Sequence, residues 1–173
     1  YGPEAEVRAL SARRDIMAAF QRYMRAQARL LPDLHRSAFH EDAYVDCGLY
    51  AGPAHGFVDF AQGFLATMKG SQHIIGQHMI EIDGDAAHGE VYFFAWHRRI
   101  ENGEERDLFI CGRYVDRYER RSGNWKIAHR SERIDWVRSE PRADDWLKNA
   151  PNMPWGARGA ADLSNQREKL RKL

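Results

Sequence analysis

The fold of this chain is decided by residues 72–100, which read QHIIGQHMIEIDGDAAHGEVYFFAWHRRI. Apolar and polar side chains alternate through much of this stretch with the period of two that is typical of β-strands. The Asp-Gly pair at 83–84 interrupts the alternation and favours the tight turn of a β-hairpin. The stretch therefore predicts two antiparallel strands, from Gln72 to Ile82 and from Ala86 to Ile100.

Two further turns continue this pattern toward the C-terminus. The Asn-Gly pair at 102–103 is a second hairpin signal, and it leads to a strand from about Arg106 to Arg120. The Ser-Gly-Asn triplet at 122–124 is a third, and it leads to a strand from Trp125 through Val137. Residues 72–137 therefore predict a four-stranded antiparallel meander.

The N-terminal segment has a helical pattern instead. From Glu4 to about Leu30 it is rich in Ala, Arg, Met and Gln and contains no Gly or Pro, which favours one long helix. Side chains at steps of three and four share the face expected to look inward, namely Ile16, Phe20, Tyr23, Met24 and Gln27. Pro32 interrupts this helix, and we expect Asp33 to cap a short second helix that runs to about Phe39.

The connection to the hairpins contains one more strand and one more helix. Ala43–Cys47 alternates enough to be a strand, whereas Gly48–Gly56 concentrates Gly and Pro and is expected to be a loop. A third helix is expected from Phe57 through Leu65, ending at Gly70. Helices followed by an antiparallel meander predict an α+β domain whose helices gather on one face of the sheet.

The chain divides into a domain and an extension. Residues 1–140 are expected to form one domain, because a chain of 173 residues suits a single core of ordinary size. Residues 141–173 contain prolines at 141, 151 and 154, and we expect them to pack on the domain or on a neighbouring subunit. Within them, Asn165–Leu173 is expected to be a short basic helix or a frayed end.

The composition excludes several classes of partner. The 26 Lys and Arg residues nearly balance the 25 Asp and Glu residues, so neither nucleic acid nor an anionic membrane is expected as a partner. No apolar run approaches the length of a membrane span, which predicts a soluble, cytoplasmic protein with Cys47 and Cys111 as reduced thiols. Because Tyr1 is not an initiator methionine, a removed targeting segment stays open as an alternative.

Two motifs in the predicted strands resemble a known family. Residues 71–76, SQHIIG, are similar to the Thr-Gln-His-Phe-Ile-Gly segment of scytalone dehydratase. Residues 118–127, YERRSGNWKI, resemble the Tyr-Glu-Arg-Arg-Asp-Gly-Val-Trp-Lys-Leu hairpin of hexachlorocyclohexane dehydrochlorinase. The similarity extends from about Arg14 to Trp136, and the chain is identified as a member of the SnoaL-like group of the nuclear transport factor 2 (NTF2-like) superfamily. The resemblance implies a cone-shaped, curved antiparallel sheet wrapped around N-terminal helices, a cystatin-like α+β barrel with a small-molecule pocket.

The resemblance also implies a set of catalytic residues. The general-base histidine of both enzymes falls on His73, the second histidine of scytalone dehydratase on His97, and the chloride-stabilising arginine of the dehydrochlorinase on Arg130. A tyrosine in the first helix of a bile-acid dehydratase of the group falls on Tyr23. The aspartate that pairs with the base histidine falls on Ala28, so His73 is expected to be a weaker base or to take its orienting partner from elsewhere.

Each of these residues also has a purely structural interpretation. His73 and Tyr23 could be core residues, His97 a histidine at the rim of a strand, and Arg130 part of a solvated strand face. A shift of the alignment by one helical turn would make Asp33 the nearest substitute for the missing aspartate.

The remaining candidates are expected to form the walls of the pocket and to contact a hydrophobic ligand. They are Phe20, Gln27, Cys47, Tyr50, Phe64, Phe94 and Tyr114. An ordinary aromatic core would give the same composition. The other histidines show no metal-ligand spacing, and the sequence contains no Gly-rich phosphate loop and no CxxC pair, so neither a metal nor a cofactor is expected.

These features lead to two hypotheses from different classes. The first is a cofactor-independent lyase for a small aromatic or alicyclic molecule, in which His73 removes a proton in an elimination or a retro-aldol cleavage. The retro-aldol reaction is suggested by lignin-degrading relatives, and an isomerase is a less favoured variant. The alternative, favoured by Ala28, is a noncatalytic small-molecule-binding or interaction protein. Because sheets of this superfamily commonly pair between subunits, a homodimer or homotrimer is expected.

Overall fold

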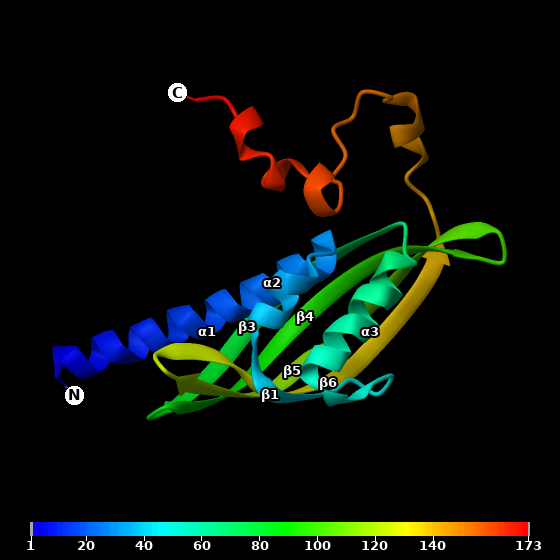
Figure 1. Cartoon of the computed structure of the whole chain (residues 1–173). Helices are drawn as coiled ribbons and strands as arrows, with labels where there is room; N and C mark the ends of the chain where they lie inside the picture. The colour runs from blue at the N-terminus through cyan, green and yellow to red at the C-terminus, as the bar shows by residue number, and fades with distance from the viewer. Residues whose placement is uncertain (1, 173) are drawn as a thin grey trace.

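A computed structural model describes residues 2–172 and consists of one strongly curved sheet with helices packed on its concave side (Figure 1). The long strands are β3 (Gly70–Asp83), β4 (Ala86–Glu101), β5 (Glu104–Arg121) and β6 (Asn124–Pro141). Each pairs with the next in antiparallel register, so the predicted meander is confirmed. With α1 (Pro3–Arg29) and α3 (Ala54–Ala66) against one face, the α+β class is confirmed too.

The second and third hairpin turns form where the sequence predicts them, because their residues accept the left-handed backbone conformation. Asn102 and Gly103 have φ angles of 52° and 80°, and Ser122 and Gly123 have φ angles of 51° and 80°. Two successive positive φ angles are the signature of the type I′ turn, whose twist matches that of the flanking strands.

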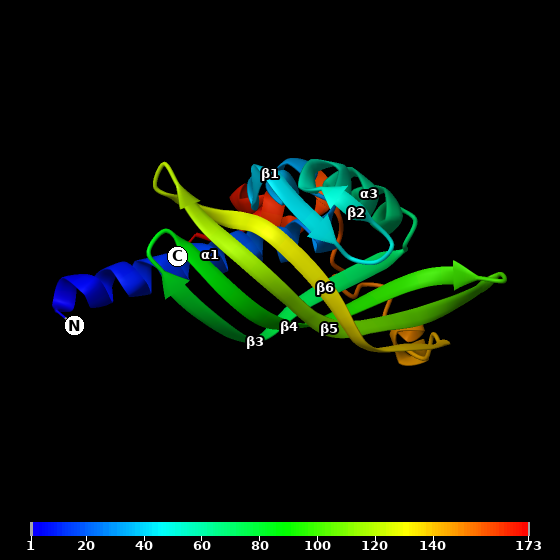
Figure 2. The ribbon, with the colours of Figure 1, turned by 90° about the horizontal axis from the view of Figure 1, so that it is seen from below.

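The sheet bends because its register shifts within the long strands (Figure 2). One shift lies between Cys111 and Gly112 of β5, where β6 has one extra residue. Such a bulge increases the local twist and bends the strand. Gly112 is required at this point, since a Cβ atom there would collide with the carbonyl oxygen of Arg133. The curvature gives the sheet its concave inner face.

The first helix buries the face that its periodicity predicts. Ile16, Phe20, Tyr23, Met24 and Gln27 are all less than 7% exposed. The helix ends at Arg29, because Leu30 adopts the left-handed conformation that closes many helices.

The short second helix, α2 (Pro32–Ser37), begins with Pro32 at its first position, where proline is favoured. Asp33 therefore lies inside the first turn, makes no cap hydrogen bond and instead pairs with Arg36, so the prediction that it caps the helix was wrong.

Two strands complete the sheet, in the order β2-β1-β6-β5-β4-β3. Strand β1 (Phe39–Asp46) pairs in parallel with β6, and it starts at Phe39, a residue that the sequence placed in the second helix. Strand β2 (Ala51–Pro53) lies within the segment predicted as a loop and pairs antiparallel with β1. A three-residue strand that contains Gly and Pro carries no alternation signal, which is why the prediction missed it.

The third helix begins and ends earlier than expected. It starts at Ala54, directly after Pro53, and ends at Ala66, while Gly70 is the first residue of β3 rather than the end of the helix. Its buried residues, Ala54, Phe57, Val58, Ala61 and Leu65, follow the spacing of one helix face. The helix lies over the concave side of the sheet (Figure 1).

Residues 142–172 run from the end of β6 to the C-terminal ends of α1 and α3 (Figure 1). They contain four short 3-10 turns, so the basic helix expected near the C-terminus is not α-helical; Leu173 lies outside the described residues. Arg29 donates a hydrogen bond to the carbonyl of Ala157 (2.7 Å), and Arg158 donates to the carbonyls of Leu65 (3.0 Å) and Met68 (2.9 Å). These hydrogen bonds attach the extension to the C-terminal ends of α1 and α3.

Among residues 2–172, none of the helices combines the length and the apolar character that crossing a membrane requires.

Candidate functional site

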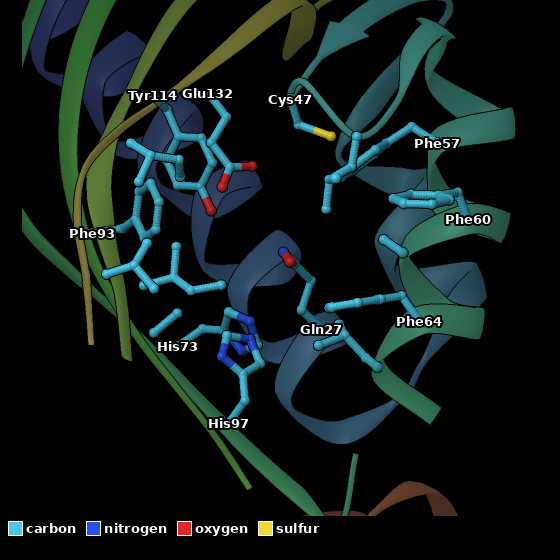
Figure 3. A pocket seen from close by; sticks show the side chains of 17 residues that line it. Gln27, Cys47, Phe57, Phe60, Phe64, His73, Phe93, His97, Tyr114 and Glu132 are labelled. Carbon is cyan, nitrogen blue, oxygen red and sulfur yellow. The ribbon is translucent and has the colours of Figure 1, made fainter. Parts of the chain in front are cut away.

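A cavity of about 280 Å³ lies between α3 and the concave face of the sheet (Figure 3). Its lining is mainly apolar and comes from α1, the connection after β1, α3 and the strands β3 to β6. The 17 lining residues are Gln27, Cys47, Leu49, Phe57, Phe60, Ala61, Phe64, Leu65, His73, Phe93, Ala95, His97, Ile110, Tyr114, Glu132, Ile134 and Val137.

Aromatic side chains form two opposite walls. Phe57, Phe60 and Phe64 occupy positions three and four residues apart on α3 and therefore project from one side of that helix. Phe93 faces them from the sheet, where its ring stacks on that of Tyr114 with centroids 4.5 Å apart. Flat apolar walls of this kind suit a ligand that contains a ring.

His73 and His97 lie together at one end of the cavity (Figure 3). Strand alternation places both side chains on the inner face, and their ring centroids are 5.4 Å apart in an edge-on arrangement. Nδ1 of His97 lies 3.3 Å from the carbonyl oxygen of Leu108. Because a carbonyl only accepts, Nδ1 carries the proton, and Nε2 of His97 is left as an acceptor.

Among residues 2–172, no carboxylate forms a hydrogen bond with the imidazole of His73. Nδ1 of His73 is buried and has no hydrogen-bond partner within residues 2–172. Ala28 and His73 both line one shallow hollow between α1 and β3. Asp33, the substitute considered above, is fully exposed and paired with Arg36. The aspartate of the dyad is therefore absent here, and the second helix does not supply a replacement.

Both histidines are electrically neutral at physiological pH. Burial, followed by the effects of His97, His35 and Arg158, lowers the pKa of His73 to about 3. Burial likewise lowers the pKa of His97, although its bond to Leu108 opposes the shift. A neutral imidazole can accept a hydrogen bond or a proton, but a low pKa makes it a weak base.

Tyr114 and Glu132 lie away from the histidines, toward the other end of the cavity (Figure 3). They are cross-strand partners on β5 and β6. The carboxyl group of Glu132 faces the cavity, and burial raises its pKa to about 7, against the opposing effect of Arg130. Sequence reasoning missed Glu132, because its alternation with Arg130 resembles a solvated strand face. The same alternation is the sequence signal that could have identified Glu132, because it places the side chain on the inner face of the sheet if Arg130 faces inward.

Gln27 is a further polar residue of the cavity. Its side chain points from α1 into the space between the two ends (Figure 3), and the residue is 6% exposed. The amide nitrogen has no hydrogen-bond partner within residues 2–172. A buried donor without a partner is costly, so this group favours a ligand that offers an acceptor.

Arg130 does not reach the cavity, contrary to the role that the resemblance implies. The residue is fully buried, and its guanidinium donates to both carboxylate oxygens of Asp116, at 2.9 and 2.7 Å. It also lies over the rings of Phe20, Tyr23 and Tyr114 at 4.2, 4.3 and 4.1 Å from their centroids. In this arrangement Arg130 is a core residue that links the sheet to α1.

The other predicted residues divide between the cavity and its surroundings. Gln27, Cys47, Phe64 and Tyr114 line the cavity together with both histidines. Tyr23 is 1% exposed and packs within the core, where burial raises the pKa of its phenol well above the ordinary value. It has no place in the lining, so a contact with substrate does not fit its position.

Three predicted wall residues, Phe20, Tyr50 and Phe94, also lie outside the lining. Phe20 is fully buried against Arg130, and Tyr50 packs behind the wall on Phe57 while its hydroxyl donates to the carbonyl of Pro53. Phe94 is 38% exposed and packs near Trp136 on the outer face of the sheet. The alternation that turns Phe93 and Ala95 inward turns Phe94 outward.

The potential metal ligands in the described part of the chain do not form a metal site. Within residues 2–172, no group of three or more His, Cys, Asp or Glu side chains is placed to hold one metal ion. The chemistry that these residues can perform is proton transfer and hydrogen bonding in an apolar enclosure.

Solved structures share this fold. Hexachlorocyclohexane dehydrochlorinase LinA type 3 from Novosphingobium barchaimii LL02 is 18% identical, with a TM-score of 0.70 over 80% of this chain and 95% of that chain. A putative scytalone dehydratase from Novosphingobium aromaticivorans DSM 12444 is 19% identical, with a TM-score of 0.68 over 78% and 91% of the two chains. A protein of unknown function with a cystatin-like fold from Nostoc punctiforme PCC 73102 is 16% identical, with a TM-score of 0.55 over 71% and 90%. At such identities the likeness shows the fold alone, an NTF2-like, cystatin-like one.

No curated protein sequence matches the chain significantly. The model of the SnoaL-like domain matches residues 8–131, which include the helices and most of the sheet. The motifs around His73 and the hairpin at 118–127 both lie within this match. This chain therefore belongs to the SnoaL-like domain family.

Proposed function

We propose that the chain is a cofactor-independent lyase that acts on a small, ring-bearing hydrophobic molecule, with His73 as its base. The observation that carries this proposal is the neutral His73 and His97 pair at one end of an aromatic cavity. The cavity volume of about 280 Å³ is close to the lower end of the range of ligand pockets, roughly 300–1,000 Å³. A ligand with one or two rings fits this size.

The state of His73 favours deprotonation of a hydroxyl group over that of an unactivated C–H group. Its pKa of about 3 makes it a weak base, and an O–H proton is the easier one to remove. In a retro-aldol cleavage, the hydroxyl proton passes to His73 and the C–O bond becomes a carbonyl. The C–C bond then breaks, and its electron pair remains on a carbon that an adjoining aromatic ring stabilises and that is subsequently protonated. Nε2 of His97, as an acceptor, can orient a second hydroxyl group of a diol substrate.

The test is an assay of purified protein on diaryl diols, aryl alcohols and halocycloalkanes. We expect His73→Gln to lower kcat/KM on the active substrate by about 100-fold or more, the usual contribution of a general base. The matched control is His129→Gln, which removes an exposed histidine of the same chain whose ring lies 3.3 Å from the hydroxyl of Ser131. Full activity of His73→Gln on a substrate that the wild-type protein converts would overturn the assignment.

A second function, noncatalytic binding of a small molecule, is favoured by one observation. Ala28 lines the same hollow as His73 and falls where the resemblance places an aspartate, so the imidazole lacks the group that would stabilise its protonated form. Under this alternative, ring compounds bind in the cavity with equal affinity in the wild-type protein and in His73→Gln, and no compound of the panel is converted.

A further inference from the structure

Glu132 is a carboxyl group that the family resemblance does not assign to any role. It lies on β6 opposite Tyr114 of β5, and its carboxyl group points into the cavity (Figure 3). No hydrogen bond or ion pair to this carboxyl group is formed by residues 2–172, although Arg130 lies two residues away on the same strand face.

Arg130 does not neutralise Glu132, because its charge is already matched. Its Nε and Nη2 atoms donate to Asp116, and Asp116 also accepts a hydrogen bond from the hydroxyl of Tyr118 at 2.7 Å. Three aromatic rings surround the guanidinium. The pair is therefore electrically balanced within itself, and an ionised Glu132 would add an uncompensated negative charge to an apolar cavity.

The other groups around Glu132 are uncharged at neutral pH. Tyr114 from β5 and Tyr23 from α1 are buried phenols whose pKa values are raised by burial, and burial also raises the pKa of the Cys47 thiol, which follows β1. From α3 the cavity receives only apolar side chains, such as Phe57 and Phe60. None of these groups can supply a positive charge, which is consistent with the pKa of Glu132 of about 7.

Glu132 is also separate from the histidine pair. Tyr114, its partner, lies opposite Val91 on β4, whereas His73 lies opposite Ala95 on the same strand. Four residues of a strand span about 13 Å, so the backbone positions of His73 and of the Tyr114–Glu132 pair are separated by about this distance along the strand direction. In Figure 3, Gln27 lies between the histidine end and the end that contains Tyr114 and Glu132. Glu132 is therefore not a displaced version of the missing dyad aspartate.

We propose that Glu132 is a ligand-binding residue which, in its protonated form, donates a hydrogen bond to an ether, carbonyl or hydroxyl oxygen at the end of the ligand remote from His73. The substrate class that fits is an oxygenated aromatic molecule, with one oxygen function near His73, a ring between the aromatic walls and a second oxygen near Glu132. The statement that this ligand is a substrate, with one oxygen function near His73, rests on the proposed function. The binding role of Glu132 does not depend on it.

The first test is a ¹³C NMR titration of the glutamate carboxyl carbons between pH 4 and pH 9. We expect one glutamate to titrate near pH 7 and its signal to be absent from Glu132→Gln. Glu140→Gln is the matched control, because Glu140 lies on the same strand, is 46% exposed in its side chain and faces Arg138 outside the cavity. Titration of every glutamate below about pH 5 in the wild-type protein would overturn the proposal. This outcome is measured on the wild-type protein alone, so it does not depend on whether a variant folds.

The second test measures the affinity of two fluorescent probes, 2-methoxynaphthalene and 2-ethylnaphthalene, which differ in one ether oxygen. The wild-type protein should prefer the ether by about fivefold at pH 5.5, the worth of one hydrogen bond, and should lose this preference above pH 8. In Glu132→Gln the preference should not change with pH, and Glu140→Gln should behave as the wild-type protein. An unchanged pH dependence in Glu132→Gln would overturn the proposal. Neither probe reports on turnover, so this result is distinguishable from a failure of the lyase assay.

Discussion

Arg130→Met removes the positive half of an ion pair that the protein encloses completely. Both side chains of the Arg130–Asp116 pair are 0% exposed, and the pair is joined by two hydrogen bonds of 2.9 and 2.7 Å. Removal of one partner leaves the Asp116 carboxylate buried without its counter-charge, for which the usual loss of stability is about 3–5 kcal/mol. For a chain of this length, that loss corresponds to a fall in Tm of about 10 °C.

The assay is chemical denaturation followed by tryptophan fluorescence, with activity or probe binding measured on the folded fraction. Arg117→Met is the control, because Arg117 forms an exposed pair with Glu119 at 3.3 Å and its loss should cost less than about 1 kcal/mol. Adding Asp116→Leu to Arg130→Met should recover part of the loss, since no unpaired charge then remains. A stability change below about 1 kcal/mol in Arg130→Met, together with lost binding or activity, would refute the structural role and restore Arg130 to the site.

The remaining predictions concern the histidines. Ala28→Asp should place a carboxylate beside His73 and raise the pKa of its imidazole by about 1 to 3, measured by NMR, with Ala28→Asn as the neutral control; equal pKa values in the two variants would contradict the placement of residue 28. Burial, followed by the charges of Arg130 and Arg36, lowers the pKa of His35 to about 3. This pKa is below the unfolded value of about 6.5, so the contribution of His35 to stability is present above pH 6.5 and is lost as pH falls toward 3, by up to about 5 kcal/mol. Urea denaturation at a series of pH values should show a shallower acid limb for His35→Gln, and an unchanged limb would contradict the assignment.

The parts of the fold that were predictable from the sequence are those fixed by local chemistry. The sequence predicted the first turn at 83–84, and it forms one residue later, at 84–85. This turn and those at 102–103 and 122–123 specify their hairpins through residues that have positive φ angles, namely Gly84, Asn102, Gly103, Ser122 and Gly123. The parallel pairing of β1 with β6 was not predictable, because it joins segments about 85 residues apart and leaves no local pattern.

The same distinction holds for the site. Alternation placed His73, His97 and Phe93 on the inner face, and the family motif singled out His73. Alternation alone did not distinguish Arg130 from Glu132, which project from the same face of β6. Arg130 binds Asp116 in the core, whereas Glu132 lines the cavity. This difference depends on the residues of α1 and β5 that pack against β6, and the sequence of β6 alone does not reveal them.

The central claim is that the cavity between α3 and the sheet is a ligand site with a histidine end and a carboxyl end. The most direct measurement is a crystal structure of the protein with 2-methoxynaphthalene. We predict that the naphthalene ring lies between Phe64 and Phe93 and that the ether oxygen lies within about 3.2 Å of the Glu132 carboxyl group. A probe bound instead on the outer face of the sheet, beside Phe94 and Trp136 with the cavity unoccupied, would contradict the claim.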